Sequence, residues 1–263
     1  MSARLFCNNI YASYNKNKEI LHDVSIDVKS GEFVALCGLN GSGKSTLLSL
    51  LAGLNPPSLY ISKAKDYPSI TNDNNSYKIK DLSRNKIARY ISFMQQSEYS
   101  IWDFSVFDFI LQGRFPYTKH GLYSKEDKEK VDNVIEELSI KEFRDRNVHS
   151  LSGGEMQKVK IARCLAQEPL FIILDEPSSN LDVVFEPRLL HLLKELTIKK
   201  KIGVLLSIHD INITSDIADK VCLLHKNGII SGSYNDVVTL ENLKITFGVD
   251  FQCSKKKYFQ LLQ

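Results

Sequence analysis

The chain has 263 residues, a formal net charge of +3 and a hydrophobic fraction of 43%. This fraction is ample for a packed core, whereas so small a positive excess does not indicate a nucleic-acid-binding or membrane-surface protein. No N-terminal segment resembles a signal peptide and no apolar run approaches the ~18 residues of a membrane span, so we expect any membrane role to require another chain.

The region from residue 5 to residue 28 has a strand-like pattern. Val24, Ile26 and Val28 alternate with polar residues, which is typical of an antiparallel sheet with one solvated face. Tyr14 lies in this region, upstream of a glycine-rich loop. Its ring can stack on a nucleotide base or serve as an ordinary core or surface tyrosine, and its position in the sequence leaves both interpretations open.

A short apolar run that begins at Phe33 leads into a glycine-rich loop. The loop fits the phosphate-binding pattern G-x-x-x-x-G-K-[ST], whose fixed positions here are Gly38, Gly43, Lys44 and Ser45. Its glycines allow successive N–H groups to turn onto phosphate oxygens, and the helix that follows adds its positive end. Lys44 can then reach the β- and γ-phosphates and Ser45 can ligate Mg²⁺. We therefore predict a strand, a loop and a helix that bind a nucleotide.

The segment after this helix has a mixed pattern. Prolines at 56 and 57 predict the helix end, and the polar stretch 57–83 predicts surface strands and loops. An ordered segment at 87–94 then ends in Gln95 and Gln96.

Residues 97–148 lack strand-like runs and are expected to form a helical appendage. Ser124 and Asp127 resemble a capping box, and a helix-spaced apolar set follows them: Val131, Val134, Ile135 and Leu138.

The stretch Leu151–Glu155 also has the form of a capping box, with Ser152 at the N-cap and a helix expected through Gln167. Two glycines in its first turn disfavour a helix, so they require a further reason. Close approach of the backbone to an anion would be one.

Two later apolar runs end in polar side chains. Residues 171–174 predict a buried strand that ends in Asp175 and Glu176. Asp175 can hold Mg²⁺ through its water shell and Glu176 can polarise a water for attack on the γ-phosphate; the alternative is a solvated acidic turn. The run 202–208 ends at His209, which can donate to a phosphate oxygen or be structural.

The C-terminal part predicts a hairpin whose turn is Asn227-Gly228, followed at 235–263 by a small helix and strand packed on the sheet. Five widely separated cysteines predict reduced thiols buried in apolar runs, and hence a reducing compartment. They are Cys7, Cys37, Cys164, Cys222 and Cys253.

The alternation of strand-like and helix-like segments favours one α/β unit with an appendage. Five elements, found in one order over nearly the whole chain, resemble the nucleotide-binding subunit of ABC transporters: 38–46, Gln96, 151–155, 174–182 and His209. The resemblance implies a single ABC ATPase domain over 1–263. Its P-loop NTPase core, a mixed sheet with flanking helices, would comprise 1–96 and 149–263 and include an N-terminal antiparallel β subdomain. An α-helical subdomain would span 97–148, and a small C-terminal extension about 235–263.

The resemblance also implies residue roles. Tyr14 would stack on adenine, Asp175 would bind Mg²⁺, Glu176 would be the general base and His209 would contact the γ-phosphate. Gln96 would approach Mg²⁺ and the attacking water. The loop residues expected to bind the phosphates and Mg²⁺ of ATP are Gly38, Asn40, Gly41, Ser42, Gly43, Lys44, Ser45 and Thr46.

By the same resemblance, Ser152, Gly153 and Gly154 would bind the γ-phosphate held by a second copy of the chain. Asp182 would cross the interface of this head-to-tail, ATP-dependent homodimer. The dimer would drive polytopic membrane permease subunits, and indirectly a substrate-binding protein, from the cytoplasmic face of the cell membrane. Nucleic acid is not an expected partner.

A finer resemblance, to importer ATPases for iron–siderophore, haem and vitamin B12, rests on the segments 113–117, 124–127, 207–212 and 247–250. The alternatives are a soluble non-transport ABC ATPase, such as one for metal-cluster assembly, and an exporter subunit. The sequence departs from the family pattern at Asn15, Gln95 and Lys158, and the stretch 57–83 lacks the usual Ser-Gly-Glu turn. Gln95 therefore competes with Gln96 for the same role.

Overall fold

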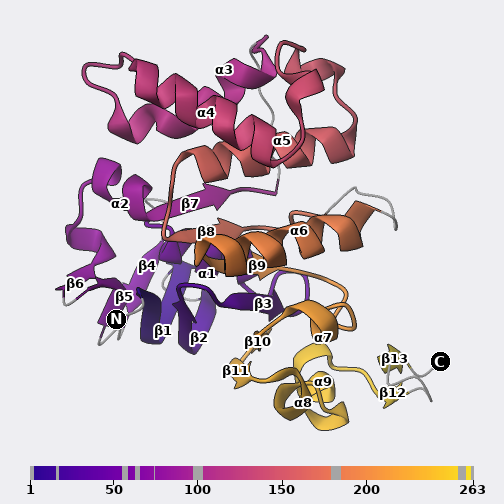
Figure 1. Ribbon diagram of the computed structural model, residues 1–263. Coiled ribbons are helices and arrows are strands. Elements are labelled where there is room, and N and C mark those ends of the chain that lie inside the picture. The colour runs from indigo at the N-terminus through magenta and orange to yellow at the C-terminus, as the bar shows by residue number, and fades with distance from the viewer. Residues whose placement is uncertain are drawn as a thin grey trace.

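The protein is described from a computed structural model, which covers residues 3–15, 18–54, 59–62, 66–73, 75–96, 103–178, 185–253 and 259–261. Helices α3, α4 and α5 lie at the top of Figure 1, an antiparallel sheet lies at the lower left, and the C-terminal helices lie at the lower right. A central sheet connects these parts.

The central sheet has six strands in the order β11-β10-β3-β9-β8-β7. All neighbouring pairs are parallel except the β10–β11 hairpin, which confirms the predicted C-terminal hairpin. Strands β3, β8 and β9 are buried throughout, as continuous apolar runs predict. The bounds are β3 (Phe33–Cys37), β7 (Ile91–Met94), β8 (Phe171–Leu174), β9 (Gly203–Ser207), β10 (Lys220–His225) and β11 (Gly228–Gly232).

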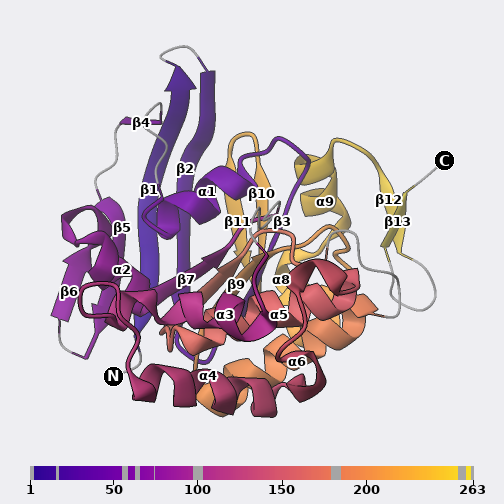
Figure 2. The ribbon, with the colours of Figure 1, turned by 90° about the horizontal axis from the view of Figure 1, so that it is seen from above.

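Alternate residues of β3 point into two different hydrophobic clusters. Phe33 and Ala35 belong to the cluster that contains helices α5 and α6, whereas Val34 and Leu36 belong to the cluster that contains helix α1 and the antiparallel strands. This period of two is the geometry of a strand buried on both faces. Figure 2 shows α1 (Lys44–Leu51) beside β1 and β2, with α6 (Phe185–Lys200) across the sheet.

The antiparallel sheet has the order β2-β1-β5-β6, and β4 also pairs with β1. The described part of the polar stretch 57–83 thus contains strands, as predicted, and two of them pair directly with β1. The bounds are β1 (Arg4–Asn15), β2 (Lys18–Lys29), β4 (Tyr60–Ser62), β5 (Asp66–Asn72) and β6 (Asn75–Lys78). A short helix, α2 (Arg84–Tyr90), leads from this sheet into β7.

The described residues between 103 and 148 form helices and 3₁₀ turns with isolated bridges, and no strand. Both predicted capping boxes are present, at Ser124 and at Ser152. The helices are α3 (Val106–Leu111), α4 (Lys125–Glu137) and α5 (Gly153–Ala166), and the 3₁₀ turns in this region are Gln112–Tyr117, Lys141–Phe143 and Val148–Ser150. In the described residues, no helix combines the length and apolar character needed to cross a bilayer.

The C-terminal region differs from the predicted single helix and strand. It contains two short helices, α8 (Tyr234–Val237) and α9 (Leu240–Phe247), and a two-stranded sheet of β12 (Phe251–Cys253) and β13 (Phe259–Leu261). Another short helix, α7 (Thr214–Ile217), lies between β9 and β10. Four cysteines are buried as predicted, but Cys253 is exposed. The prediction was wrong there: Phe251, at the start of β12, packs against the hydrophobic cluster that contains α5, but Cys253, at its end, belongs to neither cluster.

Candidate active site

A cavity of about 470 Å³ opens where β3, β7 and β8 end. The carboxyl ends of parallel strands are the usual place for ligands in open α/β sheets. Its lining residues come from the antiparallel sheet, from the glycine-rich loop and from the ends of β7 and β8: Tyr14, Ile20, Asn40, Gly41, Gly43, Lys44, Ser45, Thr46, Gln96 and Glu176. Ile20 was not predicted, because one apolar residue in a strand carries no signal for a site.

The glycine-rich loop is packed too closely for side chains at two positions. Gly43 caps α1 with a φ of 101°, and a Cβ there would lie 2.9 Å from Leu21 Cδ2. A Cβ on Gly38 would lie 2.5 Å from the carbonyl oxygen of Leu224. The loop therefore needs glycine for its fold as well as for access to a phosphate. Gly38 and Ser42 support the loop without lining the cavity.

Lys44 lies in the first turn of α1 and is only 5% exposed. Its Nζ donates to the carbonyl oxygens of Gly38 at 2.9 Å and Leu39 at 3.1 Å. Burial lowers the pKa of Lys44, although the carboxylate of Glu176 acts in the opposite direction. The ammonium is thus held at the cavity wall, where an anionic ligand would offer it stronger acceptors than two carbonyls.

Glu176 contacts two other predicted site residues, His209 and Gln96. His209 Nε2 lies 2.8 Å from its Oε1, and Gln96 Nε2 donates to its Oε2. These contacts join the ends of β7, β8 and β9, which are neighbours in the sheet. Gln96 lines the cavity and contacts Glu176, whereas Gln95 does not line the cavity.

Ser207, at the end of β9, holds the backbone around the two acidic residues. Its hydroxyl donates to Asp175 Oδ1 at 2.8 Å and accepts from the backbone N–H of Glu176 at 2.8 Å. Glu176 has a φ of 48°, a conformation that is uncommon outside glycine and that surrounding contacts must hold. Ser207 was not predicted as a site residue. A polar residue at the end of the neighbouring apolar run was the available signal.

The donor set at the cavity fits a magnesium ion. The described part of the chain contains no group of three or more His, Cys, Asp or Glu side chains placed to hold a metal. Magnesium does not need one, because one or two carboxylates, substrate phosphates and water usually hold it. Asp175 supplies a buried carboxylate, and Ser45 and Gln96 line the cavity.

The first turn of α5 does not line the cavity. Ser152 and Gly153 are exposed, and Ser152 forms its capping box with Glu155. The backbone N–H of Ser152 donates to Glu155 Oε2 at 2.7 Å, and Arg146 lies 3.7 Å from the other carboxylate oxygen. Asp182 lies outside the described residues, so the structure does not place it. The predicted site is thus divided between the cavity and a separate exposed turn.

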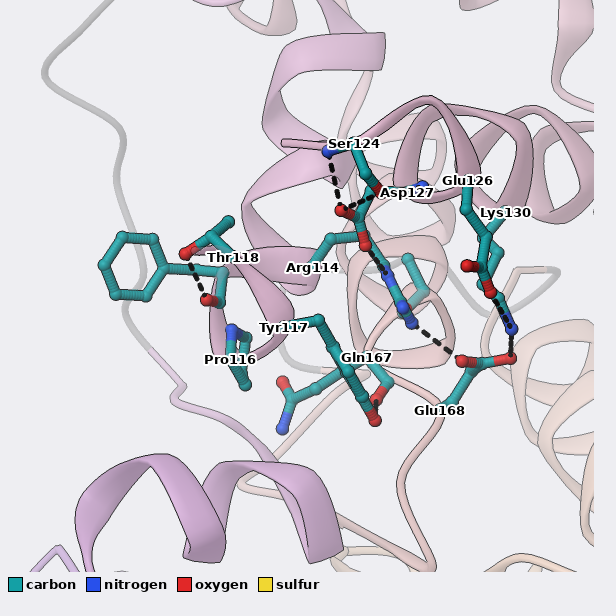
Figure 3. Close-up of polar contacts among 12 residues, drawn as sticks. Arg114, Pro116, Tyr117, Thr118, Ser124, Glu126, Asp127, Lys130, Gln167 and Glu168 are labelled. Carbon is teal, nitrogen blue, oxygen red and sulfur yellow. Dashed lines mark hydrogen bonds and ion pairs between the residues drawn. The ribbon is translucent and has the colours of Figure 1, made fainter. Parts of the chain in front are cut away.

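The opposite end of α5 is held by a buried charged network (Figure 3). Arg114, 3% exposed, donates to Asp127 at 3.0 Å, to Glu168 at 2.8 Å and to the carbonyl oxygen of Ala166 at 2.8 Å. Burial alone would raise the pKa of Asp127, but hydrogen bonds from Ser124 and Arg114 hold it below its usual value. The network joins α4 to the C-terminal end of α5.

Replacing Arg114 by methionine should lower the free energy of unfolding by about 3 kcal/mol, because the carboxylate of Asp127 would stay buried without its cation. Urea denaturation at neutral pH measures this change. The matched control is Arg144→Met, since Arg144 pairs with Asp132 near the surface and should lose less than ~1 kcal/mol. Equal losses in the two variants would contradict an origin in burial.

Comparisons with known proteins agree with this arrangement. Residues 21–179, more than half of the chain, match the family model described as ABC transporter. The chain is 31% identical to the petrobactin import ATP-binding protein FpuD of Bacillus anthracis, over 91% of the chain and 85% of the relative. It is 30% identical to the hemin import ATP-binding protein HmuV of Escherichia coli O157:H7, over 91% of each. A solved structure of a metal-chelate type ABC transporter in an inward-facing conformation superposes with a TM-score of 0.81 at 28% identity, covering 100% of this chain and 98% of that one.

Proposed function

The chain belongs to the ABC transporter family, as an ATP-binding subunit that hydrolyses ATP, and on this premise we propose that it powers a separate membrane permease that imports an iron–siderophore, haem or cobalamin-type chelate. The catalytic part of this proposal rests on one observation: Gln96 and His209 both contact the carboxylate of Glu176, which lines the phosphate-loop cavity.

Glu176 is the proposed general base. A water attacks the γ-phosphorus in line, its proton passes to the Glu176 carboxylate, and the bond to the β-phosphate oxygen breaks to release ADP. Gln96 and His209 each contact one oxygen of the Glu176 carboxylate, and each oxygen keeps a second lone pair that can accept the proton. Loss of either contact would make the carboxylate a stronger base. A bound γ-phosphate would offer the imidazole of His209 another acceptor, which links base activation to nucleotide binding.

The phosphates are proposed to lie against the glycine-rich loop and the start of α1, where Lys44 exchanges its carbonyl acceptors for phosphate oxygens. Tyr14 lines the same cavity, and its hydroxyl lies 3.2 Å from Thr46 Oγ1. Its ring is proposed to stack on the adenine of ATP. Ser45, Gln96 and Asp175 would hold Mg²⁺, which when bound neutralises charge on the β- and γ-phosphates.

Each cavity is proposed to be completed by a second copy of the chain. Ser152, Gly153 and Gly154 do not line the phosphate-loop cavity of their own chain. Their exposed turn, with the N–H groups and positive end of α5, is suited to a γ-phosphate held by the partner. In a head-to-tail dimer Asp182 would cross the interface, and ATP would favour the closed dimer that hydrolysis then opens.

The cargo and the location rest on the relatives. Two of them are named for import of petrobactin and of hemin, and the solved transporter is of the metal-chelate type. We therefore place the chain at the cytoplasmic face of the cell membrane, against polytopic permease subunits that receive chelate from a substrate-binding protein. These names do not favour the alternatives, a soluble non-transport ABC ATPase or an exporter subunit.

The experiment is to tag the chain in its native cell, solubilise the membranes gently and identify the co-purifying proteins by mass spectrometry. We expect a polytopic permease, and we expect uptake of labelled iron–siderophore, haem or cobalamin to stop when Glu176→Gln replaces the native chain. Manganese uptake is the control, because a bare ion is not a chelate. Recovery of soluble partners alone, with the chain absent from membranes, would overturn the transport function.

A further inference from the structure

The first turn of α5 rests on an aromatic ring of the same chain. A Cβ built on Gly154 would lie 2.9 Å from Cδ1 and 3.1 Å from Cε1 of Phe185, so the ring packs directly over the glycine backbone. Phe185 is the first residue of α6 and is 40% exposed. Gly154 therefore has an intramolecular reason to be glycine, in addition to any approach to a phosphate.

A second contact joins α5 to the segment after β8. Gln157, one turn beyond Gly154 and 8% exposed, donates from Nε2 to the carbonyl oxygen of Pro177 at 2.6 Å. Pro177 follows Glu176 directly in the chain. The start of α5 is thus connected to the segment that carries the proposed general base and to the first residue of α6.

The ring also borders an open space. A cavity of about 330 Å³ between α4, α5 and α6 is lined by Gly154 and Phe185 together with Leu138, Leu189 and Leu192. The nearest atoms to a Cβ on residue 154 belong to the Phe185 ring, so a smaller side chain at position 185 would leave room for a methyl group there. Replacing Phe185 by a smaller residue should therefore relieve the clash that a side chain at position 154 would cause.

We propose that Phe185 is a positioning residue that holds the turn Ser152–Glu155 where it completes the ATP site of the partner copy. The inference rests on the proposed function, in which this turn acts in trans. Phe185 does not line the phosphate-loop cavity of its own chain and, by this proposal, does not touch the nucleotide. It acts by supporting the backbone of Gly154, while Gln157 connects the same turn to the neighbourhood of Glu176.

The experiment compares ATP turnover by the full-length chain and its variants Gly154→Ala, Phe185→Ala and the double variant. Gly154→Ala should lower kcat on the order of 10²-fold, as a displacement of about 1 Å at a site can do. Phe185→Ala should lower kcat by a smaller factor, about tenfold, because the turn loses the ring but keeps the contact of Gln157 with Pro177. The double variant should recover to this level, since removal of the ring makes room for the added methyl. ATP binding to the monomer should match the wild type in all three. The matched control is Ile198→Ala, because Ile198 is an exposed apolar residue on α6, the helix of Phe185. This variant should leave kcat unchanged.

A double variant no more active than Gly154→Ala would overturn the inference, because the glycine would then be required by the phosphate alone. A second pair uses Phe185→Leu, which keeps an apolar side chain and protects the test against poor folding of Phe185→Ala; the same recovery is expected. Loss of thermal stability in Phe185→Ala with an unchanged kcat would also overturn it. Ser152→Arg in the same assay tests the trans site itself, so the two proposals fail separately.

Discussion

Replacing Glu176 by glutamine is expected to leave ATP binding intact, to lower turnover by about 10²- to 10⁴-fold and to trap an ATP-bound dimer. Glutamine has nearly the shape of glutamate, but its amide cannot take a proton from the attacking water. The dimer persists because ATP holds the two copies together until it is hydrolysed. Steady-state phosphate release, ATP-binding titration and size-exclusion chromatography with ATP measure the three effects.

The matched control for this variant is Glu195→Gln, which makes the same chemical change on the exposed side of α6. Its turnover should equal that of the wild type. If Glu176→Gln stayed active and monomeric, Glu176 would lose its role as general base. His209 would then be the next group to test, because its imidazole can accept a proton and its Nε2 lies 2.8 Å from Glu176 Oε1.

Replacing Ser152 by arginine is expected to abolish turnover while each isolated chain still binds ATP. The new side chain would fill the exposed turn that the proposal places against the γ-phosphate of the partner, and it would remove the N-cap of α5. The cavity of the same chain is not lined by Ser152 and should be unaffected. ATP titration of the monomer and phosphate release by the dimer separate the two effects. Ser231→Arg, which adds the same charge to an exposed position on β11, is the control.

Mixing the two inactive variants sharpens this test. In a dimer of Ser152→Arg with Glu176→Gln, one ATP site combines an intact Glu176 with an intact Ser152 from the partner. The mixture should regain about a quarter of the wild-type rate, because half of the dimers are mixed and each has one intact site of two. Loss of ATP binding by the isolated Ser152→Arg chain, or no activity in the mixture, would contradict a site shared between copies.

The local elements of this protein were predicted from short patterns because each pattern has a local physical cause. Buried parallel strands are continuous apolar runs, as in β3, β8 and β9. The capping boxes at Ser124 and Ser152 join residues three positions apart, and the glycine-rich loop is one continuous stretch. The roles of Gln96 and His209 came from family resemblance, since neither residue type at a strand end specifies a function by itself.

The tertiary structure decided what depends on residues far apart in the chain. Gln96 and Glu176 are 80 residues apart, and they meet only because β7 and β8 are neighbours in the sheet. Pairing of β5 with β1 gave structure to a polar stretch whose own periodicity was weak, and Cys253 is exposed on a strand that pairs with β13 in a separate two-stranded sheet. The packing of Phe185 on Gly154 has no signature in either segment, because a contact between two helices depends on how they are placed, and local patterns carry no information about that placement.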